Sequence, residues 1–247
     1  MAVQKEWFKT WFNSPYYHIL YDQRNEEEAN KFILKLKDYL KLNDTDRILD
    51  LACGAGRHAA FLSKYVGESI GVDLSENSIK QAQKTYIANN LEFYRHDMRL
   101  PFRINYFDYI FNFFTSFGYF KKEADNLKVL QSINKGLKKG GYVLIDFLNA
   151  TKVKNDLVER EQIDKHGIEF YIRREIVNNK IIKHIKFDAE DKVFSFTEII
   201  QALTKNDFHR LLTQAGFKVE AEFGDYELED FNENISNRYI VLARKNL

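Results

Sequence analysis

The sequence predicts an α/β protein built on a doubly wound, mostly parallel sheet of seven strands, into which an antiparallel β-meander is inserted. Three observations predict this fold class. Apolar runs at 47–51, 69–73 and 91–96 recur at intervals of one ordinary βα unit, with helical patterns between them. A glycine-rich turn follows the first run. Residues 151–202 then break the alternation with segments of β character.

Composition and charge describe an ordinary soluble protein. The 247 residues are enough for one large α/β domain, or for one domain with an insertion. The formal net charge of +1 gives no electrostatic reason to expect a nucleic acid or an anionic membrane as a partner. The N-terminus lacks the apolar core of a signal peptide and no run is long enough to span a membrane, so we expect a cytoplasmic protein. Cys53 is the only cysteine and no His-Glu-x-x-His or His-x-His pattern occurs, so we expect no metal site.

The chain begins with a strongly aromatic segment over about residues 1–24. One interpretation is a helix that packs on the core. The other is a lid over a pocket, because aromatic rings beside His18 and Arg24 can cover a cavity and still meet polar ligand groups. Apolar residues at helical spacing then predict a helix over 29–40, which a polar turn connects to the first strand at 47–51.

The turn after the first strand combines an acid with two glycines. Gly54 and Gly56 allow the backbone to turn sharply and a ligand to lie directly against it. Asp50 would repel the pyrophosphate of a dinucleotide, and it suits a ligand with positive charge near the turn, such as the ammonium and sulfonium of S-adenosylmethionine. From Asp50 to His58, Asp-Leu-Ala-Cys-Gly-Ala-Gly-Arg-His resembles motif I of the class I (Rossmann-like) methyltransferases. Ala52 stands where many members have a first glycine, which slightly narrows the loop.

The next two strands carry acids at the same edge of the predicted sheet. Asp73 ends the second strand, where a carboxylate usually holds a ribose diol. It matches motif II of these methyltransferases, although NAD-dependent enzymes also hold the ribose of their cofactor with an acid at this position. Ser75 is a good N-cap for the following helix, which we expect to include Ile87. After the third strand, Asp97 would accept from the adenine amino group and Met98 would lie along the ring.

The resemblance implies that S-adenosylmethionine binds at this edge of the sheet, beneath the N-terminal segment. The pattern Tyr-x-x-Leu-Tyr-x-x-Arg at 17–24 is similar to one that closes over the cofactor in related methyltransferases. We expect cofactor contacts from Tyr21, Arg24, Asp50, Ala52, Cys53, Gly54, Gly56, His58, Asp73, Leu74, Asp97, Met98, Asn112 and Phe113.

The fourth strand, over 107–114, leads into the segment where methyl donor and acceptor would meet. Enzymes that methylate exocyclic amines of nucleic-acid bases commonly carry Asn/Asp-Pro-Pro-Tyr/Phe here, whereas this chain reads Asn-Phe-Phe-Thr over 112–115. Together with the near-zero charge, this difference argues against a nucleic-acid partner and favours a small-molecule methyl acceptor. We expect substrate contacts from Tyr17, Ser116, Phe117 and Tyr119.

The alternation predicts one methyltransferase domain of residues 1–150 and 203–247, with 151–202 as an inserted β subdomain near the acceptor pocket. Substrate shaping and homodimer formation are both open uses for this insertion. Thr204 and Asp207 resemble a capping box. The remaining elements are expected as a helix from Leu127 through Leu137 that ends at 138–141, a fifth strand at 142–148, inserted strands at 168–177, 181–188 and 193–203 with a turn at Asn178-Asn179, a helix to Ala215, and strands at 217–223 and 237–244.

Methyl transfer from a sulfonium requires mainly alignment of the reacting atoms and exclusion of water. A hydroxyl or protonated amine acceptor also needs a base, for which His18, His58 and Tyr119 are the candidates. We therefore expect an enzyme that methylates a nitrogen or oxygen of a small molecule and releases S-adenosyl-L-homocysteine. A non-catalytic S-adenosylmethionine-binding module and a protein or RNA methyltransferase are the alternatives. An NAD-dependent oxidoreductase is disfavoured by Asp50 and by the lack of Gly-x-Gly-x-x-Gly.

Overall fold

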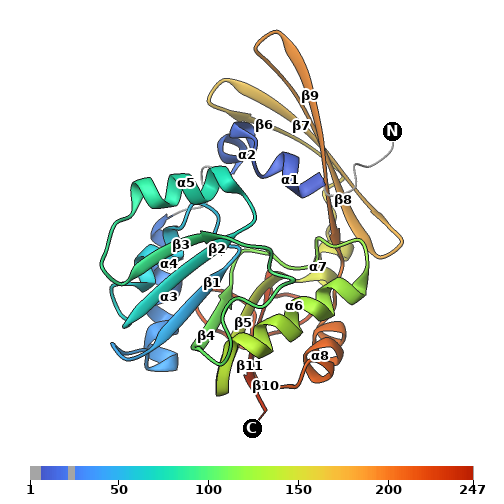
Figure 1. Ribbon diagram of the computed structural model, residues 1–247. Helices are drawn as coiled ribbons and strands as arrows, with labels where there is room; N and C mark the ends of the chain where they lie inside the picture. Colours follow the sequence, from blue (N-terminus) through green and yellow to red (C-terminus); the bar gives the residue numbers. More distant parts are fainter. Residues whose placement is uncertain (1–6, 22–25, 247) are drawn as a thin grey trace.

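The computed structural model describes residues 7–21 and 26–246. Its main body is a seven-stranded sheet in the order β10-β11-β5-β4-β1-β2-β3 (Figure 1). The pairs among β1 to β5 are parallel, and β11 pairs antiparallel with both β5 and β10. The predicted doubly wound, mostly parallel sheet is therefore confirmed. The strands are β1 (Arg47–Leu51), β2 (Glu68–Asp73), β3 (Leu91–Arg95), β4 (Phe107–Asn112), β5 (Leu137–Leu148), β10 (Phe217–Phe223) and β11 (Arg238–Lys245).

Helices cover both faces of this sheet. On one face Phe32 of α3 and Leu62 of α4 share a core cluster, and on the other Leu130 of α6 packs in a cluster with Phe208 of α8. The predicted capping box of α8 is present, since Thr204 and Asp207 each bond the other's backbone N–H. The helices are α3 (Glu26–Leu40), α4 (Arg57–Leu62), α5 (Glu76–Thr85), α6 (Glu123–Gly136) and α8 (Lys205–Gln214).

Several predicted element boundaries are wrong. Strand β4 ends at Asn112 and not at residue 114, and the last strand of the second sheet ends at Gln201 and not at residue 203. Helix α5 ends at Thr85, and Ile87 lies beyond it with 89% of its surface exposed. The connection to β3 turns away here because the Asn90 side chain donates to the carbonyls of Ser63 and Val66. Helix α6 ends at Gly136, and 137–141 belongs to β5, because Leu137 already pairs with Phe107 of β4.

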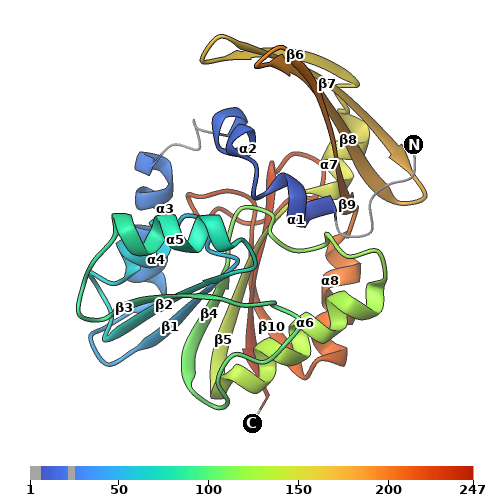
Figure 2. The same cartoon turned by 45° about the horizontal axis from the view of Figure 1, so that its top comes forward.

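Residues 160–201 form a second, antiparallel sheet in the order β6-β7-β8-β9, after the short helix α7 (Ala150–Asn155). Figures 1 and 2 place it beyond the carboxyl ends of the parallel strands. The predicted turn at Asn178-Asn179 is confirmed. Strand β6 was not predicted, because Ile163 is its only apolar residue and most of its side chains are exposed. The strands are β6 (Arg160–Lys165), β7 (Ile168–Val177), β8 (Lys180–Ala189) and β9 (Lys192–Gln201).

Two short helices of the aromatic N-terminal segment lie between the two sheets (Figure 2). They are α1 (Trp7–Trp11) and α2 (Pro15–Leu20), and the second begins where Ser14 caps it and Pro15 fixes its first turn. One set of their side chains packs against the second sheet, and another set faces the main body. Among the described helices, none combines the length and the apolar character needed to cross a membrane.

Candidate active site

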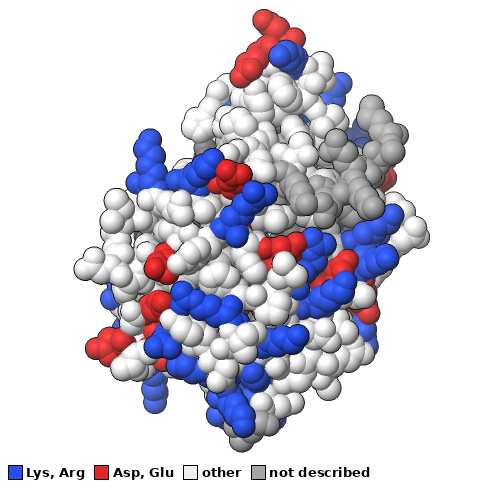
Figure 3. Space-filling model, in the orientation of Figure 1, with Lys and Arg blue, Asp and Glu red and all other residues white. Residues whose placement is uncertain are grey.

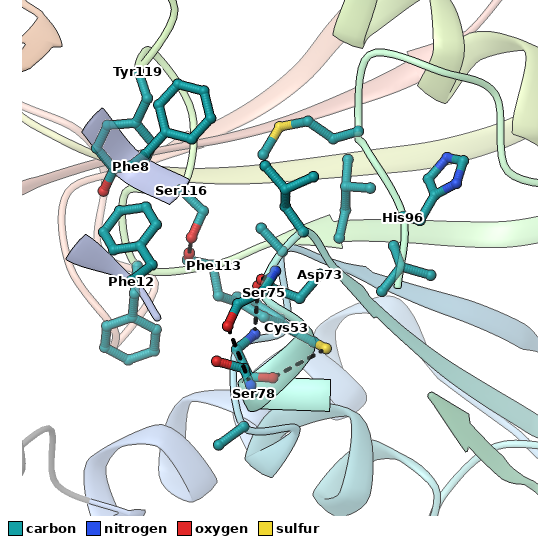
Figure 4. Close-up of a pocket in the computed structure, with 18 of the residues that line it drawn as sticks. Phe8, Phe12, Cys53, Asp73, Ser75, Ser78, His96, Phe113, Ser116 and Tyr119 are labelled. Atoms are coloured by element: carbon teal, nitrogen blue, oxygen red, sulfur yellow. Dashed lines mark hydrogen bonds between the residues drawn. The ribbon is translucent and has the colours of Figure 1, made fainter. Parts of the chain in front are cut away.

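A cavity of about 310 Å³ opens at the carboxyl ends of β1, β2 and β4, beneath α1 and α2 (Figure 4). This is the edge where open α/β sheets bind ligands. The cavity has two halves, one formed by the glycine-rich turn and the ends of β2 and β3, the other by aromatic rings. Predicted site residues that line it are Tyr17, His18, Tyr21, Ala52, Cys53, Gly54, His58, Asp73, Leu74, Asp97, Met98, Phe113, Ser116 and Tyr119.

The two glycines of the turn have different roles, one beside the cavity and one in close packing. Gly54 has φ +56°, lines the cavity, and a Cβ added there would meet nothing within 4 Å. Its bare backbone therefore leaves room that a ligand can occupy. Gly56 has φ +86°, and a Cβ there would lie 2.5 Å from Phe93 and 2.8 Å from Ala82. Gly56 does not line the cavity, so it serves close packing, and its expected place at the cofactor is corrected.

The left-handed backbone begins before the first glycine. Ala52 has φ 63°, a conformation that alanine adopts only at a steric cost. This explains physically why a glycine suits the position in the related motif. Cys53 is buried, and its backbone N–H donates to the carbonyl of Val72, which fixes the turn to β2.

Asp73 ties the turn to the end of β2. Its Oδ2 accepts from the N–H of Gly54 at 2.9 Å and its Oδ1 from the N–H of Ser75 at 2.7 Å. Burial raises the pKa of the Asp73 carboxyl, against the lowering effect of these backbone donors. Ser75 caps the N-terminus of α5. Its hydroxyl also donates to Oδ1 of Asn13 at 2.7 Å, and this hydrogen bond joins the N-terminal segment to the loop after β2.

Asp50 does not line the cavity but is buried behind the turn, 1% exposed. Burial raises its pKa to about 7, and the charge of Asp73 adds to this effect, while the Ala59 backbone and Arg57 oppose it. Its Oδ2 is buried and accepts no hydrogen bond within the described chain. A buried carboxylate in this state is stabilised by positive charge brought nearby. The turn, Asp73 and Asp50 together therefore fit a cationic nucleoside such as S-adenosylmethionine.

Asp97 and Met98 line the cavity beyond β3, and Arg99 accompanies them. The Asp97 carboxylate accepts from the Arg99 guanidinium at 2.5 to 3.1 Å and from its backbone N–H at 3.0 Å. Burial favours the neutral acid, but these hydrogen bonds outweigh it and hold the pKa of Asp97 below its usual value. Arg99 also lies over the ring of Phe120, 5.1 Å from its centroid.

Two further predicted residues lie outside the cavity wall. Asn112 is buried and donates to the carbonyl of Leu51 at 2.7 Å, so it joins β4 to β1. Phe117, expected at the substrate, is fully buried instead, with its ring 5.6 Å from that of Phe208. Its assignment to the substrate is corrected, because the left-handed residues around it direct its side chain into the core. Arg24 lies outside the described residues.

The other half of the cavity is lined by aromatic rings. The Phe12 ring lies 4.9 Å from that of Tyr17 and 5.4 Å from that of Tyr119, at interplanar angles of 61° and 68°. His18 lines the same half, and burial lowers the pKa of its imidazole, so it is neutral at pH 7. Tyr21 donates to Glu198 of β9 at 2.7 Å, which connects this half to the second sheet.

Lining residues that the sequence analysis did not assign come mainly from long-range contacts. The side chain of His58, an expected residue, stacks on the ring of Phe114 at 5.0 Å and 12°, and Arg57 covers the same ring at 5.0 Å. Arg57 and Ser75 carried a local signal as neighbours of the two motifs, and Phe8 and Phe12 belong to the aromatic segment that was interpreted as a lid. The unassigned lining residues that carry side-chain contacts are Phe8, Phe12, Asn13, Arg57, Ser75, Ser78, His96, Arg99, Phe114 and Phe120.

Comparison with known proteins agrees with this geometry. Residues 48–141 match the family model described as a methyltransferase domain. A relative from Geobacillus sp. (strain WCH70), which carries a methyltransferase name, is 33% identical over 237 residues, or 85% of this chain and 89% of its own. The chain belongs to the class I S-adenosylmethionine-dependent methyltransferases. The cofactor of this methyltransferase is accordingly S-adenosylmethionine.

Two other proteins extend the likeness. The crystal structure of an S-adenosylmethionine-dependent methyltransferase from Clostridium acetobutylicum ATCC 824 superimposes with a TM-score of 0.80 at 20% identity, covering 94% of this chain and 96% of that one. A dTDP-3-amino-3,4,6-trideoxy-alpha-D-glucopyranose N,N-dimethyltransferase from Streptomyces venezuelae is 26% identical over 72% of this chain and 77% of its own. Within residues 7–21 and 26–246, this methyltransferase has no group of three or more His, Cys, Asp or Glu side chains suited to a metal ion.

Proposed function

We propose that this methyltransferase transfers the methyl group of S-adenosylmethionine to an amine nitrogen of a small molecule. The observation that carries the proposal is the ring-lined half of the cavity, where Phe12, Tyr17 and Tyr119 meet near His18. Aromatic faces attract a cation by roughly 0.5–2 kcal/mol, depending on desolvation. N-methylation passes through an ammonium, whereas O-methylation ends in a neutral ether, so these rings favour the amine.

His18 supplies the base that the amine needs. Because burial keeps its imidazole neutral, it can take a proton from a bound ammonium and free the nitrogen lone pair. The N–CH3 bond then forms as the S–CH3 bond breaks, the sulfur keeps the bonding electrons, and the proton stays on His18 until solvent removes it. The amino-sugar activity in the name of the Streptomyces venezuelae relative also supports an amine acceptor.

The cofactor half would hold S-adenosylmethionine through the bare backbone of Gly54, the carboxylates of Asp73 and Asp97, and Met98. When bound, the cofactor supplies a methyl group that is already activated on a sulfonium. The chain's contribution is to orient the two molecules and exclude water. Asn13 and the aromatic rings of the N-terminal segment contribute to this by lining the cavity, and Figure 4 shows Phe8 and Phe12 among them.

We also propose that residues 151–202 are an inserted subdomain that shapes the acceptor half. Glu198 accepts from Trp11 at 2.6 Å and from Tyr21 at 2.7 Å, and Lys183 donates to the Tyr21 hydroxyl at 2.7 Å. These contacts favour substrate shaping over dimer formation. On the face shown in Figure 3, acidic side chains interrupt the basic ones, which favours a small molecule over a nucleic acid as acceptor.

The test is transfer of a tritiated methyl group from S-adenosylmethionine to matched pairs of acceptors. Tyramine and its alcohol analogue tyrosol form one pair, and glucosamine and glucose form a second. The amino sugar named for the Streptomyces venezuelae relative and bulk tRNA complete the panel. Label is expected in an amine and not in the alcohols. Label in an alcohol or in tRNA would overturn the amine proposal, and cofactor binding without any transfer would favour a non-catalytic module.

A further inference from the structure

Two consecutive residues directly after β4 adopt a left-handed backbone. Phe114 has φ 55° and Thr115 has φ 59°, and neither is a glycine. Each residue held in this region costs roughly 1–3 kcal/mol, and such strain persists only where the surroundings impose it. The strained pair opens the segment 113–120, which supplies one wall of the cavity. The members of this segment that line the cavity are Phe113, Phe114, Ser116, Tyr119 and Phe120.

Asp146 and Arg238 hold the strained pair. The Asp146 carboxylate accepts from the N–H of Phe114 at 2.8 Å, and its main-chain carbonyl accepts from the N–H of Thr115 at 2.9 Å. Arg238 donates through Nε to Oδ1 of Asp146 at 2.8 Å and through Nη2 to the Thr115 hydroxyl at 2.9 Å. Tyr226 adds a hydrogen bond to Asp146 at 3.2 Å.

Formation of this ion pair carries a large desolvation cost, since the side chain of Asp146 is fully buried and that of Arg238 is only 21% exposed. Buried ion pairs often add little to stability compared with well-packed apolar side chains. The main effect of this pair is to fix the position of a neighbouring aromatic ring. It fixes Phe114, whose ring stacks on His58 at 5.0 Å and lies 5.4 Å from the ring of Tyr226. The contacts therefore run from β5 and β11, through the end of β4, to the turn after β1.

We propose that Asp146 and Arg238 are positioning residues that set the cavity wall of residues 113–120 against the His58 side of the glycine-rich turn. The proposal rests on the proposed function only in taking this wall as part of the acceptor half. A lysine at 238 keeps the charge, but one ammonium group cannot reproduce the planar fork that reaches Asp146 and Thr115 together. Phe114 and Thr115 would then relax, and the Phe114 ring would leave His58.

The experiment compares Arg238→Lys with Arg244→Lys, which lies on the same strand but is exposed at its far end. The first readout is the NMR resonance of the His58 ring, assigned with His58→Gln, because stacking on Phe114 shifts it by the ring current. Arg238→Lys is expected to remove the part of this shift that Phe114 causes and to leave the part due to Phe113, whose ring also lies 5.0 Å from that of His58. The affinity for S-adenosylhomocysteine is expected to stay within about twofold. Arg244→Lys is expected to change neither. An unchanged His58 resonance in folded Arg238→Lys, or a parallel loss of S-adenosylhomocysteine affinity, would overturn the proposal.

A kinetic arm uses the amine that is methylated in the acceptor panel. Arg238→Lys is expected to raise its KM by about tenfold with little change in the KM for S-adenosylmethionine. Adding Thr115→Gly should recover part of this loss, because glycine adopts a positive φ without strain. If no amine is methylated, the proposed function has failed, whereas the His58 resonance and the S-adenosylhomocysteine affinity still decide the positioning role.

Discussion

Ser75 donates a hydrogen bond of 2.7 Å to the side chain of Asn13, and both residues line the cavity. This contact joins the connection between α1 and α2 to the first residue before α5, and Asn77 adds a weaker bond to the Asn13 carbonyl at 3.3 Å. The N-terminal segment is therefore held by the same loop that follows Asp73.

Asn13→Ala is expected to weaken S-adenosylhomocysteine binding about fivefold, because one hydrogen bond contributes about 1 kcal/mol to holding the cover closed. The dissociation rate in a stopped-flow displacement experiment should rise by the same factor. Asn234→Ala, at an exposed position of the β10–β11 connection, is the matched control. Equal dissociation rates in Asn13→Ala and the control would contradict this role.

Alanine at the two glycines of the turn should have different main effects, on stability at Gly56 and on ligand binding at Gly54. Gly56→Ala places a Cβ against Phe93 and Ala82 and is expected to lower the free energy of unfolding by roughly 2–4 kcal/mol. Gly54→Ala points its Cβ into open space, so it should cost only about 1 kcal/mol of stability. It should instead weaken S-adenosylhomocysteine binding about tenfold, by filling room beside the ligand. Urea unfolding and calorimetric titration of both variants measure these effects, and identical profiles would refute the distinction.

Asp50 should make the ligand-free protein less stable as the pH rises. Its folded pKa of about 7 lies above the unfolded value of about 3.9, so its stabilising protonation is complete below the unfolded value and is lost through pH 7. Urea unfolding between pH 5 and 8 is expected to show a loss of roughly 1–4 kcal/mol from Asp50. Asp50→Asn should remove this contribution and leave that of Asp73, whose pKa burial also raises. Asp188→Asn, exposed on β8, should leave the pH dependence intact. Bound S-adenosylmethionine should reduce the loss more than S-adenosylhomocysteine, which lacks the sulfonium charge.

His18 should determine the acid limb of the rate profile. Burial lowers its pKa, so kcat/KM for the amine is expected to fall only below the ordinary histidine value of about 6.5. His18→Gln should lose that limb and reduce kcat by about a hundredfold. His166→Gln, in the exposed turn between β6 and β7, is the control. An unchanged acid limb in His18→Gln would assign the base to another group.

Local signals in the sequence were sufficient for the sheet and for most of the residues that line the cavity beside the glycine-rich turn. Asp73 and Asp97 follow strands whose apolar runs are unmistakable, and Gly54 belongs to a contiguous motif. The same signals could not tell the role of Gly54 from that of Gly56, because Gly56 is confined by Phe93, a residue of β3 that is distant in the sequence. Asn13 was not foreseen for the same reason, since its partner Ser75 is far away in the chain.

The aromatic run after β4 shows where periodicity fails. Phe113, Phe114, Phe117 and Phe120 fall at helical spacing, yet this segment forms no helix, because three of its residues, Phe114, Thr115 and Gly118, adopt a left-handed backbone. Whether each ring faces the cavity or the core therefore depends on Asp146 and on residues of β11, not on neighbours in the sequence. This explains why Phe117 was assigned to the substrate although its ring lies in the core.

The bonds from Trp11 and Tyr21 to Glu198 have a practical consequence for engineering. They make the acceptor side a composite of two segments, residues 7–21 and the second sheet, that are separated by most of the chain. A chimaera that exchanges only the inserted sheet would pair foreign strands with the native helices and leave Glu198 or its replacement without matching donors. Acceptor preference should therefore be transplanted as a two-piece cassette, with α1 and α2 moved together with β6 to β9.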